Sequence, residues 1–280
     1  MKLSLVCSLA LAATAMVPAA ERITYAEVSS RALGRALPVA VIAPETLPAG
    51  TEAPVLFLLH GRGRHHRSLI DSPVARDALL TAAFYVVLPQ GEDGWYLDSP
   101  AQPAARYAAY LAEVVAWAER TLPVGRTAAR RGIAGWSMGG YGAVRCAETH
   151  PGKFGFVASV IGLLDFPRAE TLPEGQNYKV PIARFTADPA TWAALNPLNS
   201  VDQLRGTALT LVLATKGFER TMNEHFLAAL AAQTPPLPAR VHRLEGGHEF
   251  SLVERAIPLV LADAAECFYK NTAIPLLSIP

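Results

Sequence analysis

Short apolar runs alternate along the chain with longer stretches in which apolar residues recur at helical spacing. Continuous apolar runs are typical of strands that are covered on both faces of a sheet. Predicted strands of this kind lie at residues 55–59, 84–88, 156–161 and 209–214, and a last predicted strand lies at 240–244. Predicted helices lie at residues 73–82, 106–121, 141–150, 221–232 and 251–269. This alternation predicts an α/β fold with a mostly parallel central sheet and helices on both faces.

Two parts of the chain depart from this alternation. Residues 22–28 and 35–42 alternate apolar and polar positions on either side of Gly34, which predicts an antiparallel hairpin at an edge of the sheet. Residues 165–207 have no clean period and are rich in proline and glycine. We expect an irregular insertion there, near the functional site, with one short helix at 189–195. Since no segment has the composition of a linker, we expect a single domain over residues 20–280.

The first residues have the pattern of a secretory signal peptide. Lys2 precedes an apolar stretch at residues 3–16 that is too short to span a membrane, and Val17 and Ala19 fit the small-residue cleavage site. We therefore expect a signal peptide at residues 1–19 and an exported protein, either secreted or periplasmic. No later segment has eighteen uninterrupted apolar residues, so we expect no stable membrane insertion.

Composition narrows the class of protein. Of the 280 residues 51% are hydrophobic and 18% are charged, and the net charge is +1, which favours a globular domain with a large core over a nucleic-acid binder. Cys146 and Cys267 are expected as two buried thiols, with one disulfide as the alternative. Nothing in the chain has metal-ligand spacing. The nearby histidines His60, His65 and His66 are expected in a solvated loop.

The sequence Gly-Trp-Ser-Met-Gly at residues 135–139 carries the clearest chemical signal. It follows the apolar pair Ile133 and Ala134 and precedes a predicted helix. A serine on such a sharp strand-to-helix turn holds its hydroxyl clear of the sheet, and the two glycines avoid collisions with the neighbouring strand and helix. Ser137 is therefore the candidate nucleophile. The alternative is a glycine-rich turn that happens to contain serine.

A candidate general base follows the last predicted strand. His248 lies in a glycine-flexible loop after residues 240–244, and the carboxyl ends of parallel strands meet at one edge of a sheet. A histidine at this place can reach the serine as a base. The alternative is a capping or surface histidine.

The acid that orients the histidine is less clearly marked. In α/β-hydrolases the chain order is serine, acid, histidine, with the acid usually after the strand that precedes the last one. That loop, residues 215–220, contains no aspartate, so Glu219 is the candidate. Glu224 and Asp165 are the alternatives.

When a serine attacks a carbonyl group, the oxyanion that forms needs two backbone donors. One candidate is the N–H of Met138, which follows the nucleophile. The other is the N–H of Arg62, because Gly61 and Gly63 keep that loop open to a substrate. We expect the Arg62 side chain to point to solvent.

Four motifs together resemble the putative esterase family, which includes esterase D, secreted feruloyl and acetyl-xylan esterases, and mycolyltransferases. They are Leu-Leu-His-Gly at 58–61, Gly-Trp-Tyr-Leu-Asp-Ser-Pro at 94–100, the serine turn extended to 135–142, and the segment 188–198. The resemblance covers roughly residues 33–270. It implies an α/β-hydrolase fold and a serine-dependent carboxylic-ester hydrolase without a cofactor.

Carried over by position, the resemblance implies Ser137 as nucleophile, His248 as base, and the N–H groups of Arg62 and Met138 as oxyanion donors. The acid departs from the esterase D pattern, which has an aspartate near Gly217. The loop here resembles that of the mycolyltransferases, with a glutamate.

The segment 94–100 has two interpretations. Trp95 and Tyr96, together with Trp136, are expected to wall the substrate pocket beside the serine. Alternatively, Asp98 and Ser99 cap the helix that follows while the aromatic rings fill space.

The sequence as a whole predicts an exported serine carboxylesterase that works through an acyl-enzyme. The family resemblance, together with the expected export, implies a small-molecule or polysaccharide-linked ester as substrate, such as a feruloyl or acetyl group. The alternatives are an acyltransferase to a sugar or lipid acceptor, a non-catalytic binding protein of the same fold, and a depolymerase of polyester or cutin. Oligomeric state is not indicated.

Overall fold

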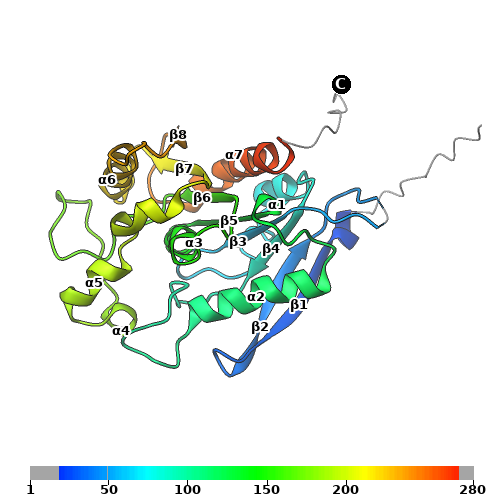
Figure 1. The fold of residues 1–280 in the computed structure, drawn as a ribbon, viewed down its shortest axis with the longest axis horizontal. Coiled ribbons are helices and arrows are strands. Elements are labelled where there is room, and N and C mark those ends of the chain that lie inside the picture. Colours follow the sequence, from blue (N-terminus) through cyan, green and yellow to red (C-terminus); the bar gives the residue numbers. More distant parts are fainter. Residues whose placement is uncertain (1–18, 49, 271–280) are drawn as a thin grey trace, which may run out of the picture.

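The central sheet has eight strands in the order β1-β2-β4-β3-β5-β6-β7-β8 (Figure 1). The computed structural model describes residues 19–48 and 50–270. The predicted signal peptide, apart from its last residue, lies outside these residues. The strands are β1 (Ile23–Ser30), β2 (Arg35–Ile42), β3 (Val55–Leu59), β4 (Tyr85–Pro89), β5 (Arg131–Trp136), β6 (Phe156–Val160), β7 (Ala208–Ala214) and β8 (Ala239–Leu244).

The helices follow the strands as the hydrophobic pattern predicts. They are α1 (Pro73–Leu79), α2 (Tyr107–Thr121), α3 (Met138–Thr149), α4 (Ile182–Phe185), α5 (Pro189–Leu195), α6 (Arg220–Ala231) and α7 (Phe250–Tyr269), with the 3-10 helices η1 (Ala19–Arg22), η2 (Ala128–Arg130) and η3 (Pro197–Leu204). The start of helix α1 is determined by two residues of the sequence. Ser72 Oγ accepts from the N–H of Ala75 as the N-cap, and Pro73 occupies the first turn.

Strand pairing confirms the predicted sheet. Strands β1 and β2 form an antiparallel hairpin at the edge, and β2 pairs antiparallel with β4. All the other neighbouring pairs, from β4-β3 to β7-β8, are parallel. The carboxyl ends of β3, β5, β6, β7 and β8 therefore lie along one edge, and the loops that follow these strands can meet there.

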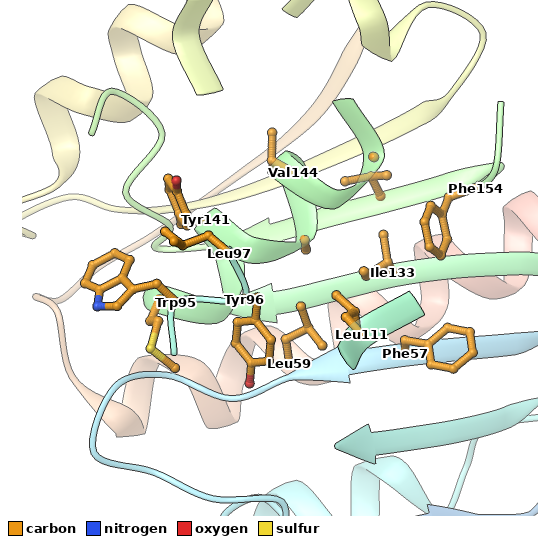
Figure 2. Close-up of a cluster of buried hydrophobic side chains, with 14 of the residues drawn as sticks. Phe57, Leu59, Trp95, Tyr96, Leu97, Leu111, Ile133, Tyr141, Val144 and Phe154 are labelled. Carbon is orange, nitrogen blue, oxygen red and sulfur yellow. The ribbon is translucent and has the colours of Figure 1, made fainter. Parts of the chain in front are cut away.

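The two faces of the sheet carry separate hydrophobic clusters. Side chains alternate between faces along a strand, so in β3 Val55, Phe57 and Leu59 join the cluster covered by α2, α3 and α6. Leu56 and Leu58 join the cluster covered by α1 and α7. Figure 2 shows part of the first cluster, with Phe57 and Leu59 facing α2 and α3 residues. Helices on both faces fix the sheet rigidly beneath the loops at its edge.

The insertion between β6 and β7 contains more helix than the sequence pattern predicts. The short helix at 189–195 is present as α5, whose start is capped by Asp188 Oδ1 accepting from the N–H of Ala190. Helices α4 and η3 on either side of it were not predicted. A helix of four residues is too short to display a period, and η3 is broken by non-helical Ser200.

The cysteines and the longer helices test two further expectations. Cys146 in α3 and Cys267 in α7 are free, so the disulfide alternative is wrong. Burial raises the pKa of the Cys146 thiol to about 12. Within residues 19–48 and 50–270, no helix combines the length and the apolar character that crossing a membrane requires.

Candidate active site

Ser137 lies on a strained turn between β5 and α3. Its backbone has φ 54° and ψ −119°, a conformation that non-glycine residues rarely adopt. A Cβ on Gly135 would lie 2.3 Å from the carbonyl oxygen of Gly139, and a Cβ on Gly139 would lie 2.3 Å from that of Leu59. Both glycines are therefore needed for the turn to fit against its neighbours, as the sequence motif predicts.

His248 connects Ser137 to Glu219 by two hydrogen bonds. His248 Nε2 lies 2.8 Å from Ser137 Oγ, and His248 Nδ1 lies 2.8 Å from Glu219 Oε2. A carboxylate can only accept, so Nδ1 carries the proton and Nε2 accepts from the serine hydroxyl. The three side chains come from the loops after β5, β7 and β8, which end at the same edge of the sheet.

The three groups differ in their exposure. The Glu219 side chain is only 1% exposed, and its Oε1 atom has no hydrogen-bond partner within the part of the chain that the structure describes. The His248 side chain is 20% exposed, and Ser137 is half-buried. The carboxylate is thus held away from water, while the hydroxyl and the imidazole remain open to a substrate.

The two alternative acids lie elsewhere. Buried Asp165 accepts from His225 Nδ1 and Asn196 Nδ2, both at 2.8 Å, and is paired with Arg168. Glu224 forms an ion pair with Arg243 at 3.0 Å on the surface. The structure therefore brings Glu219, and neither of these carboxylates, to the histidine.

The predicted oxyanion donors flank the serine turn. Met138 is the first residue of α3, where the backbone N–H has no partner within the helix ladder. Arg62 follows Gly61, at which a Cβ would lie 2.7 Å from the indole Nε1 of Trp136. The absence of a side chain at Gly61 lets the loop after β3 come close to the serine turn.

The Arg62 side chain does not point freely to solvent as expected. Its Nη1 donates to the hydroxyl of Tyr178 at 2.8 Å, and its Nε lies 3.1 Å from Asp93 Oδ1. These bonds raise the pKa of the guanidinium, with the Tyr178 hydrogen bond as the largest cause. The loop after β3 is thereby attached to two other segments at the edge of the sheet.

His60 is buried, although the sequence predicts a solvated loop. It is 1% exposed, with Nδ1 2.8 Å from the carbonyl of Gly61 and Nε2 accepting from the N–H of Gly91 at 2.8 Å. Burial lowers its pKa to about 4, so the ring is neutral at neutral pH. The ring joins the loop after β3 to the loop after β4.

Trp95 and Tyr96 lie in the interior, not on an open pocket wall. They are 1% and 2% exposed and belong to the buried cluster of Figure 2. The Trp95 ring stacks on Phe166 at 5.1 Å, and the Tyr96 hydroxyl accepts from the N–H of His60 at 3.0 Å. Trp136, 4% exposed, is also buried. These three rings are therefore part of the buried interior next to the site and do not form an open wall of a substrate pocket.

The capping interpretation of the segment 94–100 holds for one residue. Asp98 Oδ1 accepts from the N–H of Ala109 in the first turn of α2 at 3.0 Å. Ser99 Oγ instead accepts from the N–H of Gln102, ahead of the helix.

Two aromatic residues beside the histidine were not predicted. The ring of Phe218 lies 4.4 Å from that of His248, and the ring of Tyr178 stacks on Phe218 at 5.4 Å. Phe218 could have been noticed, because it precedes the candidate acid. Tyr178 lies in the irregular insertion, where the sequence has no pattern that would place it.

Comparison with known proteins identifies the family of the chain. A family model described as "Putative esterase" matches residues 30–250. The chain belongs to the putative esterase family. The family resemblance expected from the motifs is therefore confirmed, and the description of the family agrees with the expected class of ester hydrolase.

Individual relatives are more distant. The chain is 26% identical to Esterase Rv1288 of Mycobacterium tuberculosis over 88% of its own length, and spans 62% of the length of the curated relatives it matches. A Staphylococcus aureus protein, the fluorophosphonate-binding serine hydrolase FphF, is similar in structure with a TM-score of 0.72 and 17% identity over 86% of this chain and 97% of FphF. A ferulic acid esterase aligns with a TM-score of 0.67 and 21% identity over 86% of this chain and 98% of that one. These similarities confirm the predicted α/β-hydrolase fold.

No group of three or more His, Cys, Asp or Glu side chains suited to a metal ion occurs in residues 19–48 and 50–270.

Proposed function

We propose that the chain is a serine carboxylesterase with Ser137 as nucleophile, His248 as general base and Glu219 as the acid that orients it. The observation that carries this proposal is the unbroken line of two 2.8 Å hydrogen bonds from Glu219 through His248 to Ser137. The strained backbone of Ser137, which turns its hydroxyl toward the histidine, supports the same conclusion.

The proposed reaction follows from the donors and acceptors in this line. His248 Nε2 takes the hydroxyl proton as Ser137 Oγ attacks the ester carbonyl, and the N–H groups of Arg62 and Met138 stabilise the oxyanion. Glu219 stabilises the imidazolium that forms. The tetrahedral intermediate then expels the alcohol, which receives its proton from His248, and water releases the acid from the acyl-enzyme in the same way.

For the substrate we propose an ester outside the cytoplasm, either a small molecule or a feruloyl or acetyl group on a polysaccharide. The expected signal peptide supports export. The half-buried rings of Phe218 and Tyr178 beside His248 offer an aromatic surface to an aryl acyl group. Similarity in fold to a ferulic acid esterase points the same way.

The test measures turnover of p-nitrophenyl acetate, p-nitrophenyl butyrate and methyl ferulate, together with labelling by a fluorophosphonate probe. We expect the wild type to hydrolyse at least one ester and to be labelled at Ser137, and Ser137→Ala to lose both. Wild-type turnover by Ser137→Ala would overturn the mechanism. Addition of an alcohol acceptor separates hydrolysis from acyl transfer, because a transferase would form the new ester in preference to the free acid.

A further inference from the structure

The side chain of Arg62 connects three segments that are far apart in the sequence. Arg62 lies in the loop after β3, its Nη1 donates to Tyr178 of the insertion at 2.8 Å, and its Nε lies 3.1 Å from Asp93 in the loop after β4. Its backbone N–H is the proposed oxyanion donor, and it lies in a turn that the N–H of Arg64 closes by donating to the carbonyl of Gly61 at 3.1 Å. The side-chain bonds of Arg62 add two further attachments to this turn, so they contribute to the position of the donor.

The other side of Tyr178 contacts the general base through one intervening ring. Tyr178 stacks on Phe218 with ring centroids 5.4 Å apart and planes 17° apart. The Phe218 ring in turn lies 4.4 Å from the His248 ring. One tyrosine thus touches the oxyanion loop with its hydroxyl and, through Phe218, the imidazole with its ring.

Tyr178 is itself held firmly although it lies in an irregular segment. Gln176 Oε1 accepts from the N–H and the hydroxyl of Thr221 at 3.2 and 3.1 Å, which attaches the insertion to the first turn of α6. The Asn177 side chain exchanges two 2.7 Å hydrogen bonds with the backbone of Leu172. The residues before Tyr178 are therefore anchored next to the helix that begins after Glu219.

We propose that Tyr178 is a positioning residue that fixes the Arg62 oxyanion donor and the His248 base relative to each other. This inference rests on the proposed esterase function. A donor displaced by a fraction of an ångström stabilises the transition state less than a fixed one, while ground-state binding changes little, so the effect falls on kcat.

The first test is Tyr178→Phe, which removes the hydroxyl and keeps the stacked ring. We expect kcat for p-nitrophenyl acetate to fall about tenfold to 100-fold, with KM changed less than about twofold. The rate of fluorophosphonate labelling of Ser137 should fall in parallel, and the Tm should stay within a few degrees. The matched control is Tyr110→Phe, because the buried Tyr110 hydroxyl has no hydrogen-bond partner among the described residues. This control should keep wild-type kcat.

The second test is a double-mutant cycle with Arg62→Met, which leaves the backbone N–H in place. If the bond between the two side chains carries the effect, the double variant loses no more kcat than either single variant. Independent, multiplying losses would overturn the proposal, and so would a wild-type kcat in Tyr178→Phe. If Tyr178→Phe were insoluble, Arg62→Met alone would test the same bond by its kcat and labelling rate.

The third test is Tyr178→Leu, which removes the ring as well. We expect a further loss of kcat and a shift in the pH profile of kcat/KM, because the Phe218 ring against His248 loses its support. A profile identical to that of Tyr178→Phe would contradict the coupling to the base. Failure of the proposed function is seen separately, as a wild type that is neither labelled at Ser137 nor active on any ester.

Discussion

His248 Nδ1 lies 2.8 Å from Glu219 Oε2, and this carboxylate occupies the space that a side chain at Gly217 would fill. A Cβ built on Gly217 would lie 2.1 Å from Glu219 Oε1 and 2.5 Å from Oε2. The longer side chain of the glutamate therefore folds back over the glycine two residues earlier. We therefore expect that a shorter acid at position 217 can reach the same imidazole as the longer acid at position 219.

Glu219→Gln tests the role of the acid. An amide can still hydrogen-bond to Nδ1 but favours the wrong tautomer and does not stabilise the imidazolium, so we expect kcat to fall about 10³- to 10⁴-fold. Steady-state hydrolysis of p-nitrophenyl acetate measures this. Glu224→Gln, on the exposed pair with Arg243, is the matched control and should retain wild-type kcat. Asp165→Asn should lower the Tm while most activity remains, and the reverse pattern would assign the acid to Asp165.

Because the Glu219 carboxylate occupies the space beside Gly217, an acid introduced at position 217 is expected to restore activity to a variant that lacks Glu219. Trimming the glutamate in Glu219→Ala empties the space beside Gly217, and adding Gly217→Asp places a carboxylate near the vacated position. We expect the double variant to recover at least about tenfold in kcat over Glu219→Ala, because a restored carboxylate again stabilises the imidazolium. Gly217→Asn in the same background supplies the same shape without the charge. Equal rates for the aspartate and asparagine variants would show that position 217 cannot supply the acid.

Local pattern was enough to predict the sheet and part of the site. Ser137 could be assigned from the spacing of the glycines around it, between a predicted strand and a predicted helix. His248 could be assigned because its loop follows the last predicted strand. The acid could not be fixed in this way, because Glu219 and Asp165 both follow strands that end at the same edge of the sheet. Only their packing separates them, since Asp165 is already bound by His225, Asn196 and Arg168.

Burial was harder to predict than element order. His60 was expected in solvent because basic residues follow it, yet it comes directly after a strand whose five residues are all buried, and it is buried itself. Trp95 and Tyr96 were expected at the pocket, yet their rings fill the core. Tyr178 could not be assigned at all, because its contacts with Arg62 and Phe218 span 116 and 40 residues of chain and leave no local period.

Gly139→Ala tests the packing of the serine turn. The added Cβ would lie 2.3 Å from the carbonyl oxygen of Leu59 and 2.7 Å from that of His60, and backbone cannot yield as a side chain does. We expect the free energy of unfolding to drop by about 3 kcal/mol or more. Gly247→Ala is the stability control, because the nearest atom to its Cβ is 4.0 Å away. Urea denaturation compares the two, and equal midpoints would contradict the packing argument.

Because His60 is buried in its neutral form, we expect the protein to lose stability as the pH falls. Its pKa is about 4 in the folded chain and 6.5 ordinarily, so the unfolded chain binds more protons below pH 6.5. The His60 contribution to the free energy of unfolding is therefore fully present above pH 6.5 and is lost as the pH falls to about 4. The loss amounts to about 3 kcal/mol for a shift of this size.

Urea denaturation at several pH values between 7 and 4 measures this slope in the wild type and in His60→Gln. Glutamine can keep one hydrogen bond to the backbone of Gly61 or Gly91 but does not titrate. We expect the variant to be less stable at pH 7, because the fit to both loops is lost, and to have a shallower slope between pH 6.5 and 4. An unchanged slope would mean that other groups, such as the nearby His66 and Glu92, carry the acid sensitivity.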